Sequence, residues 1–279
     1  MNTQQGSPAW FAARQGKLTA SRFGAAAGIG YESRRKCLRI AIGKEEWKGN
    51  NLACTWGTQN EKNAVKDYMV RTGNVVTHRG FYEHPVYPWL GGSPDGLVGE
   101  RGLIEVKCPF IKKECHLHIP PTYYCQINGL MEILDKDWCD FVSWTPTEMK
   151  IYRVYRDPEL FDYLLDRYCI FYAFMKRGCD AVPRVTSAEK QDVLTRIAKS
   201  DETHCFYHFW EALEPGNLRG QWDAPPDFDA FDVVDTDDCS TSGESPSSKR
   251  KMEDDTTSLC TVQRLEESAT GICPANADC

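Results

Sequence analysis

The sequence lacks the long apolar runs that a membrane protein needs. No stretch approaches the roughly 18 consecutive apolar residues of a membrane-spanning helix. The polar first residues also lack the apolar segment of a secretory signal. Internal repeats are missing too, which argues against a solenoid or a propeller. We therefore expect an intracellular protein, in the cytoplasm or the nucleus, without a membrane partner.

The 13 cysteines lack the spacing of a small disulfide-stabilised domain. Their odd number and a reducing compartment predict mostly buried thiols. Five residues of types that bind zinc lie close together in the sequence: Cys108, Cys115, His116, His118 and Cys125. Their spacings match no strong zinc pattern, so we favour core thiols and loop histidines over a zinc site.

The sequence lacks a net positive charge, and its net charge of −7 is unusual for a protein that binds nucleic acid. Residues 223–279 hold 14 acidic and 4 basic residues, which leaves 26 acidic and 29 basic residues in 1–222. A mildly basic body is compatible with a groove that follows phosphates. Residues 223–279 are also rich in Asp, Ser, Thr and Pro and show little periodicity. We predict a single domain over residues 1–222 and a disordered acidic tail over 223–279.

The stretch from Gly91 to Lys107 is Gly-Gly-Ser-Pro-Asp-Gly-Leu-Val-Gly-Glu-Arg-Gly-Leu-Ile-Glu-Val-Lys. Short apolar runs on either side of residues 99–102 predict a β-hairpin. Alternate strand residues share a face, so Glu105 and Lys107 point the same way and the hairpin places Asp95 beside Glu105. Two carboxylates and an ammonium at one point suit a hard cation such as Mg²⁺. An isolated Glu-x-Lys would indicate only a surface ion pair, but the complete string is more specific.

Helices and strands are predicted on both sides of this hairpin. Apolar spacing and caps indicate one helix that starts near residue 8 and a second that begins within residues 17–24. Further helices are predicted over 31–42, 55–71, 122–134, 157–178, 187–199 and 203–213. Alternation indicates strands over residues 75–78, 80–84, 139–144 and 150–155. Strands flanked by helices predict an α/β or α+β domain on a mixed central sheet.

The string around Asp95, Glu105 and Lys107 resembles the core motif of the PD-(D/E)xK nucleases, in the branch of phage lambda exonuclease and the YqaJ viral recombinases. Three further motifs of that family appear in the same order: Trp10-x-x-x-Arg14-x-Gly16-x-x-Thr19-Ala20-Ser21, Trp56-Gly57-x-x-x-Glu61 and Gln126-x-x-x-x-Met131. The resemblance implies a restriction-endonuclease-like core with a mixed sheet. Its motifs lie within residues 8–155, and C-terminal helices over 157–213 follow.

The same resemblance assigns roles to individual residues. The metal ligands would be Glu61, Asp95, Glu105 and the main-chain carbonyl of Val106. Lys107 would either orient and help to deprotonate the attacking water or stabilise charge on the phosphate. Gln126 would position the water or the scissile phosphate. Without the resemblance, Glu61 and Gln126 would be interpreted as ordinary surface residues of helices.

Arg14, Thr19 and Ser21 resemble the family's pocket for a 5′-terminal phosphate. An arginine grips phosphate oxygens at two points. Hydroxyls close to the N-terminus of the predicted second helix would add further donors. An isolated Arg14 would be a solvated surface charge, and only its motif favours the phosphate role.

The resemblance implies a Mg²⁺-dependent deoxyribonuclease, with Mn²⁺ able to substitute. Its expected activity is 5′-to-3′ digestion of double-stranded DNA ends, which releases 5′-mononucleotides and leaves 3′ single strands for recombination or repair. An endonuclease of the same superfamily and a non-catalytic DNA-end-binding protein are the alternatives. Expected partners are DNA ends, a single-strand annealing protein and further copies of the chain, since relatives form trimers. A viral protein that acts in its host cell would fit this expectation.

Overall fold

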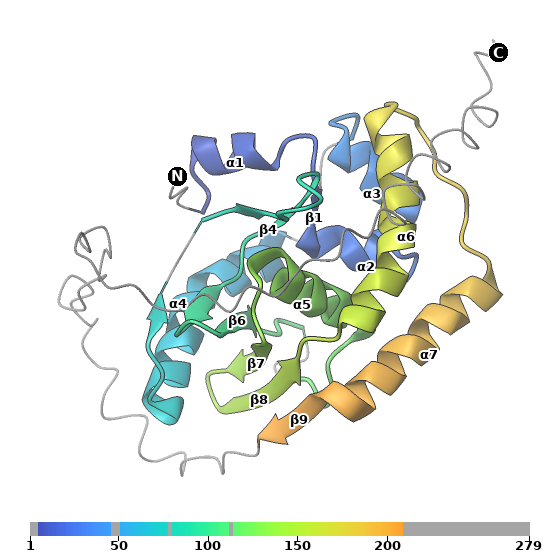
Figure 1. Ribbon diagram of the computed structural model, residues 1–279. Helices are drawn as coiled ribbons and strands as arrows, with labels where there is room; N and C mark the ends of the chain where they lie inside the picture. Colours follow the sequence, from blue (N-terminus) through green and yellow to red (C-terminus); the bar gives the residue numbers. More distant parts are fainter. Residues whose placement is uncertain (1–4, 46–50, 78–79, 112–113, 209–279) are drawn as a thin grey trace, which may run out of the picture. The chain divides into compact units, whose positions relative to one another are not determined.

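The computed structural model describes residues 5–45, 51–77, 80–111 and 114–208 (Figure 1). The predicted tail over 223–279 and the end of the predicted helix over 203–213 lie outside these residues. The helices are α1 (Pro8–Arg14), the 3₁₀ turn η1 (Ala20–Arg22), α2 (Phe23–Ala26), α3 (Arg34–Ala41), α4 (Asn51–Thr72), α5 (Pro121–Leu134), α6 (Pro158–Lys176) and α7 (Ser187–His204). The strands are β1 (Leu18–Thr19), β2 (Val76–Thr77), β3 (Tyr82–Glu83), β4 (Leu90–Gly92), β5 (Gly96–Val98), β6 (Gly102–Lys107), β7 (Trp138–Thr145), β8 (Glu148–Tyr155) and β9 (Cys205–His208).

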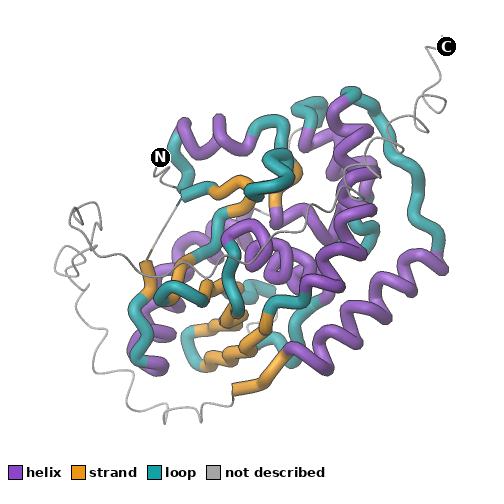
Figure 2. Tube along the Cα trace, in the orientation of Figure 1, coloured by secondary structure: helices purple, strands orange, loops and turns teal. Residues whose placement is uncertain are grey.

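The strands form two sheets, with helices packed around them (Figures 1 and 2). The larger sheet has the order β2-β5-β6-β7-β8-β9, in which β6 and β7 are parallel and the other neighbours are antiparallel. The smaller sheet has the order β1-β4-β3. This mixed arrangement confirms the predicted α/β class. Of the smaller sheet, the sequence predicts only β3, within the strand expected over residues 80–84, because strands of two or three residues carry little periodic signal.

The central strand β6 presents alternate side chains to two different cores. Ile104 and Val106 pack in a cluster that includes residues of α4. Leu103 instead belongs to the larger cluster, which includes residues of α5 and α6. Helices α4 and α5 therefore cover opposite faces of the sheet, and Glu105 lies on the face that α5 covers.

Helix α5 lies close to α2 because two glycines leave room for it. A Cβ on Gly129 would lie 2.2 Å from the ring of Phe23. A Cβ on Gly24 would lie 2.3 Å from the hydroxyl oxygen of Thr122. A larger residue at either position would displace α5, and with it Gln126.

Helix α6 closes the larger core. Asp157 caps its N-terminus, because the Asp157 side chain accepts a hydrogen bond of 3.0 Å from the backbone N–H of Leu160. Gly178 follows its end in the left-handed conformation, with φ of 65°. The buried stripe consists of Leu160, Phe161, Leu164, Leu165, Tyr168, Phe171, Phe174 and Met175. This stripe is part of the larger core.

Two predicted helices differ from the structure. Residues 17–24 are not one helix, because Leu18 and Thr19 pair with β4 as strand β1 and the helical turn begins only at Ala20. Helix α7 continues to His204, but Cys205–His208 form β9 along the edge of β8 instead of the predicted helix. In the described ranges, no helix is long and apolar enough to cross a membrane.

Candidate active site

The β5–β6 hairpin brings two of the predicted carboxylates together. Gly96 is the register partner of Ile104, so Asp95 lies at the level of Glu105. Oδ2 of Asp95 accepts a hydrogen bond of 2.7 Å from the backbone N–H of Val106. The Asp95 side chain is thereby directed across the hairpin onto β6.

Glu105 is buried, with 2% of its surface exposed. Its Oε1 accepts hydrogen bonds from the ammonium of Lys107 and, at 2.7 Å, from the side-chain amide of Gln126 on α5. Its Oε2 is also buried and has no hydrogen-bond partner in the structure. A buried carboxylate oxygen without a partner costs free energy. In native proteins such an atom is accounted for by a bound ion or water or by a catalytic role.

Burial and mutual repulsion raise the pKa values of the glutamates. Burial raises the pKa of Glu105 to about 8, and the charge of Asp95 contributes to the same shift. Burial and the charge of Asp95 likewise raise the pKa of Glu61, on α4, to about 7. Burial lowers the pKa of Lys107, but the charges of Glu105 and Asp95 outweigh it and raise that pKa above its usual range. Three carboxyl groups therefore share one ammonium, and the surplus of negative charge that their ionised forms would carry raises the pKa values of the two glutamates.

This surplus suits a hard divalent cation. Glu61, Asp95 and Glu105 supply carboxylate oxygens of the kind that Mg²⁺ prefers, and Oε2 of Glu105 has no competing partner. Within the part of the chain that the structure describes, no three side chains of His, Cys, Asp or Glu already surround a common point. The residues thus fit the cation by charge and by donor type, without a preformed cage.

The predicted phosphate-binding residues lie in the N-terminal segment. The guanidinium of Arg14 lies 4.0 Å from the ring centroid of Trp10. Burial and the nearby charge of Arg22 lower the pKa of Arg14 to about 10. The hydroxyl oxygens of Thr19 and Ser21 are 3.4 Å apart, and Ser21 directly precedes Arg22. Two arginines near two hydroxyls form an environment that favours an anion.

The structure gives the helix N-terminus near Thr19 a smaller role than the sequence predicts, and it shows an additional contact of Trp10. Thr19 makes no capping hydrogen bond, and the following α2 has only four residues. So short a helix contributes little dipole, and the arginines are the main source of positive charge here. In addition, Nε1 of Trp10 donates a hydrogen bond of 2.8 Å to Ser93, two residues before Asp95. Trp10 therefore connects the segment that carries Arg14 to the carboxylate cluster.

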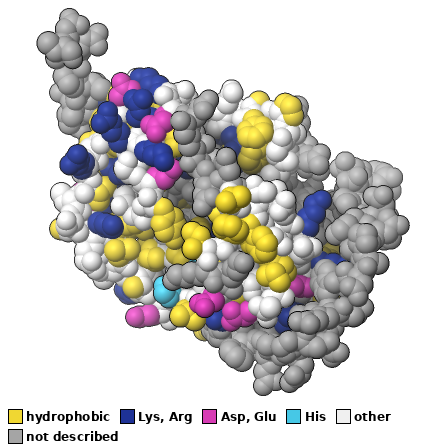
Figure 3. Space-filling model, turned by 180° about the vertical axis from the view of Figure 1, so that it is seen from behind, with side chains coloured by type: hydrophobic (Ala, Val, Ile, Leu, Met, Phe, Trp, Pro, Cys, Tyr) yellow, Lys and Arg dark blue, Asp and Glu magenta, His cyan; other side chains and the backbone are white. Residues whose placement is uncertain are grey.

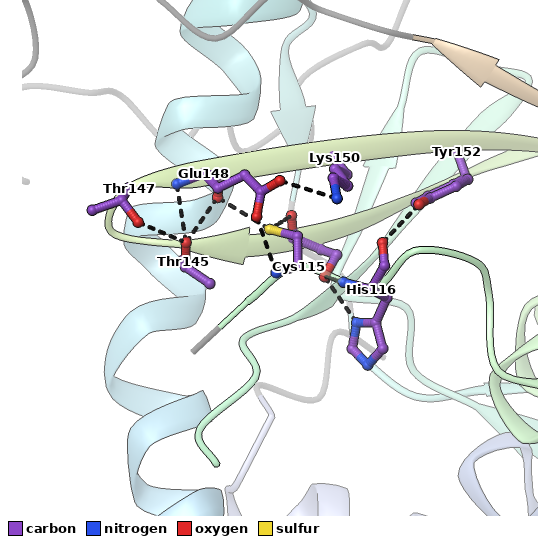
Figure 4. A network of polar contacts seen from close by, with 8 residues as sticks. Cys115, His116, Thr145, Thr147, Glu148, Lys150 and Tyr152 are labelled. Atoms are coloured by element: carbon purple, nitrogen blue, oxygen red, sulfur yellow. Dashed lines mark hydrogen bonds and ion pairs between the residues drawn. The ribbon is translucent and has the colours of Figure 1, made fainter. Parts of the chain in front are cut away.

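The loop after β6 is fastened to the β7–β8 hairpin (Figure 4). The Cys115 thiol donates hydrogen bonds to the carbonyls of Ser143 and Glu148, at 3.0 and 3.3 Å. The backbone N–H and the ring Nδ1 of His116 lie 2.9 and 2.8 Å from the hydroxyl oxygen of Ser143. The Tyr152 hydroxyl donates to the His116 carbonyl at 2.6 Å. Two members of the candidate zinc set thus anchor this loop through contacts with protein groups.

The basic side chains around α3 do not form an uninterrupted positive stripe. Ion pairs of 3.0 to 3.2 Å join them to acidic side chains: Lys36–Glu32, Arg39–Glu45, Arg39–Asp180 and Lys44–Asp180. Figure 3 shows lysine and arginine side chains gathered in one region of the face turned away from Figure 1, with acidic side chains among them. Pairing of this kind contrasts with the surplus of negative charge around Glu105.

Tyr123 is a neighbour of the cluster that the sequence analysis does not identify. Its ring centroid lies 4.8 Å from Nζ of Lys107. Tyr123 precedes Gln126 by three positions on α5, so helical spacing puts both on one face. That spacing is a signal by which the sequence could have revealed Tyr123.

Comparisons with known proteins identify the family of this chain. The YqaJ-like viral recombinase domain matches residues 9–137. The crystal structure of an alkaline exonuclease from Laribacter hongkongensis (LHK-Exo) is 31% identical, with 69% of this chain and 99% of that chain covered and a TM-score of 0.53. The chain belongs to the YqaJ-like viral recombinase family. LHK-Exo in complex with dAMP gives 30% identity, coverage of 71% and 97%, and a TM-score of 0.51.

The segment that matches the family domain contains the whole candidate site. Residues 9–137 extend from α1 to the end of α5 and include both the Arg14 region and the Glu105 cluster. The solved relatives are alkaline exonucleases, so this is an exonuclease-like member of the recombinase family. A comparison with curated protein sequences finds no match.

Proposed function

We propose that this protein is a Mg²⁺-dependent 5′-to-3′ exonuclease that acts on double-stranded DNA ends. The observation that carries the proposal is the buried Glu105, which binds Lys107 and Gln126 through one oxygen and has no partner on the other. Asp95 and Glu61 add the negative charge that a divalent cation would neutralise. LHK-Exo has been solved with dAMP, and a nucleoside monophosphate is the product of such digestion.

In the proposed reaction, water attacks the phosphorus of a phosphodiester in line with its bond to the 3′ oxygen. That bond breaks, the 3′ oxygen takes up a proton, and the released nucleotide keeps its 5′ phosphate. The residues that would hold the cation are Glu61, Asp95, Glu105 and the main-chain carbonyl of Val106. A bound Mg²⁺ supplies positive charge to the phosphate oxygens and lowers the pKa of water.

Lys107 and Gln126 position each other because both donate to Oε1 of Glu105. Lys107 would orient and help to deprotonate the water, or it would stabilise charge on the phosphate. A Lys107→Arg variant separates these roles, because arginine keeps the charge but cannot release a proton at physiological pH. Substantial activity in that variant would support charge stabilisation. Gln126 would hold the water or the scissile phosphate through its amide.

The Arg14 region supports the direction of digestion. The guanidinium of Arg14 lies within electrostatic range of Arg22, and Ser21 directly precedes Arg22 in the chain. Such a group of donors is suited to a 5′-terminal phosphate. An enzyme that cuts within a duplex does not need a pocket for a chain end. The proposal therefore favours an exonuclease over an endonuclease.

The test is digestion of linear and covalently closed circular duplex DNA in Mg²⁺, with the linear DNA labelled at its 5′ or 3′ ends. We expect the linear DNA to lose its 5′ label first, as mononucleotides, and the circular DNA to stay intact. Cleavage of the circle would identify an endonuclease. Hydrolysis of neither substrate, in Mg²⁺ or in Mn²⁺, would contradict the proposal and favour a non-catalytic end-binding protein.

Partners and location form part of the same proposal. A 3′ single strand left by digestion would pass to a single-strand annealing protein inside the cell. Several copies of the chain, three by analogy with the family, would assemble around the duplex. Light scattering of the purified chain tests the assembly, and a monomer at working concentration would contradict it.

A further inference from the structure

Beside the Glu105 cluster lies an aromatic pair that the proposed chemistry does not use. Tyr31 meets Tyr123 edge-on, with ring centroids 6.2 Å apart and planes at 63°. Tyr123 in turn lies 4.8 Å from Nζ of Lys107. Tyr123 also packs against His116 and Phe141, at centroid distances of 5.9 and 6.0 Å, and His116 is itself anchored (Figure 4). Tyr123 is thus well supported, and Tyr31 lies against it.

Tyr31 is 78% exposed, although its loop is tightly held. The preceding residue, Gly30, lies so close to α2 that a Cβ there would be 2.6 Å from Cα of Ala25. Gly28 has a φ of 91°, and a Cβ there would be 2.6 Å from the Val185 side chain. The backbone before Tyr31 therefore packs closely against α2 and Val185 at its two glycines, while the tyrosine ring itself stays exposed. An exposed aromatic ring on a rigid support is a surface on which nucleic-acid bases stack.

We propose that Tyr31, supported by Tyr123, stacks on the base nearest to the scissile phosphate and so positions the DNA strand at Lys107. This inference rests on the proposed nuclease function and names a substrate contact for it. Burial and Tyr123 raise the pKa of Tyr31 while the charge of Lys107 lowers it, which places the two side chains within electrostatic range. Stacking accepts any base, since every base has a π face, and so it suits an enzyme that digests without sequence preference.

The chain offers a matched control in Tyr155. This residue is 41% exposed and also meets another aromatic ring edge-on, since Phe206 lies 5.6 Å away at 79°. Tyr155 pairs with Trp138, and Trp138 pairs with Gly102 at the start of β6. Lys107 lies at the other end of β6, about 16 Å along the strand. Loss of Tyr155 therefore removes an exposed, paired tyrosine remote from the cluster.

The experiment compares Tyr31→Ala, Tyr31→Phe and Tyr155→Ala in the full chain. The substrates are duplex ends with normal nucleotides or with one abasic nucleotide at the first or second 5′ position. On normal ends we expect Tyr31→Ala to raise KM about ten- to a hundredfold, Tyr31→Phe to recover most of this loss, and Tyr155→Ala to resemble wild type. On the abasic end that lacks the stacked base, Tyr31→Ala and wild type should have the same KM. Binding of the same ends in EDTA, measured by fluorescence anisotropy, should show the same pattern without cleavage.

Three results would overturn the inference. In the first, the KM of Tyr31→Ala equals that of wild type. In the second, the KM of Tyr31→Ala rises by the same factor on normal ends and on both kinds of abasic end. In the third, the KM of Tyr31→Phe rises as much as that of Tyr31→Ala. An active wild type with any of these results removes Tyr31 as a stacking residue and leaves the nuclease proposal intact. A wild type that neither binds nor digests ends would remove the nuclease proposal and this inference together.

Discussion

Two buried carboxylates on neighbouring strands are held in opposite ways. Asp140 on β7 is 1% exposed, and both of its oxygens are bonded. Oδ1 accepts from Nε of Arg153 at 2.8 Å, and Oδ2 accepts from Nη2 of Arg153 at 2.8 Å and from the Tyr68 hydroxyl at 2.7 Å. Glu105 on β6 is equally buried, but one of its oxygens has no partner. Burial alone therefore does not distinguish a structural carboxylate from a functional one.

The two clusters also differ in their balance of charge. One guanidinium matches the one carboxylate of Asp140, and Arg153 is further held by the Trp138 ring, 3.9 Å away. In the other cluster, the carboxyl groups of Glu105, Asp95 and Glu61 share one ammonium, that of Lys107. A balanced and fully bonded cluster stabilises the fold, whereas an unbalanced one costs stability and is typical of a site that binds a ligand.

The largest expected effect is the loss of nuclease activity in Glu105→Gln. This change keeps the shape of the side chain but removes the charge that would hold a cation, so the rate should fall at least about a hundredfold. Removing one of several repelling charges should leave the free energy of unfolding unchanged or raise it. Digestion assays and urea denaturation of the same preparation test both statements. Asp95→Ala and Lys107→Ala should likewise abolish cleavage in a folded protein, and retention of more than about a tenth of the activity would contradict the site.

The reverse outcome is expected for Asp140→Asn. The change leaves Arg153 without a charge partner, and breaking a buried pair in this way should lower the free energy of unfolding by about 3–5 kcal/mol. Digestion at a temperature where the variant is folded should proceed at the wild-type rate. A variant of normal stability that has lost activity would show that Asp140 belongs to the functional site and not to the structural framework.

Arg14→Ala should impair the enzyme selectively. A charge-assisted contact to a terminal phosphate is worth roughly 1.5–3 kcal/mol, so the preference for 5′-phosphorylated over 5′-hydroxyl ends should shrink about ten- to a hundredfold. Arg14→Lys should recover only part of it, because an ammonium cannot make the planar two-point contact. Rates on the two kinds of end give the measurement. Equal loss on both would make Arg14 a general backbone contact.

The smallest expected effect concerns the buried His84, whose ring nitrogen Nδ1 can accept hydrogen bonds only when the ring is neutral. Its Nδ1 accepts hydrogen bonds of 3.1 Å from the backbone N–H groups of Val86 and Tyr87. Burial lowers the pKa of His84 to about 4, below the value of about 6.5 in an unfolded chain. Between these values the unfolded state binds more protons, so this contribution to stability is present above about pH 6.5 and is lost as the pH falls towards 4.

The measurement for His84 is the free energy of unfolding at pH 7 and pH 5 in wild type and in His84→Gln. One proton contributes at most about 1.4 kcal/mol per pH unit to the slope. The variant is expected to be less stable at pH 7 but to lose less stability on acidification. An identical slope in both proteins would show that His84 does not titrate in this range.

Much of the candidate site could be predicted because it is local in the sequence. The turn-rich residues 99–102 determine the hairpin register, and this register places Asp95 at the level of Glu105. Strand alternation then places Lys107 on the same face as Glu105. The contact between Asp140 and Arg153 could also have been found, since both lie opposite one another across the β7–β8 hairpin.

Other features depend on contacts that no periodicity records. Strand β1 forms because Leu18 and Thr19 meet β4, about 70 residues later in the chain. Strand β9 forms because β8 offers an open edge, which overrides the helical pattern of residues 203–213. The partnerless oxygen of Glu105 follows from the way that α5 covers the sheet, and no spacing in the sequence shows it.

A divalent cation should bind the Glu105 cluster and neutralise its excess of carboxylate groups over ammonium groups. Thermal unfolding in increasing Mg²⁺, without DNA, tests it directly for wild type, Glu105→Gln and Asp140→Asn. We expect the Tm of wild type and of Asp140→Asn to rise with Mg²⁺ concentration, as mass action requires for a ligand of the folded state, and the Tm of Glu105→Gln to stay constant. A wild-type Tm that does not change with Mg²⁺ concentration, or an equal rise of Tm in Glu105→Gln, would contradict cation binding at this cluster.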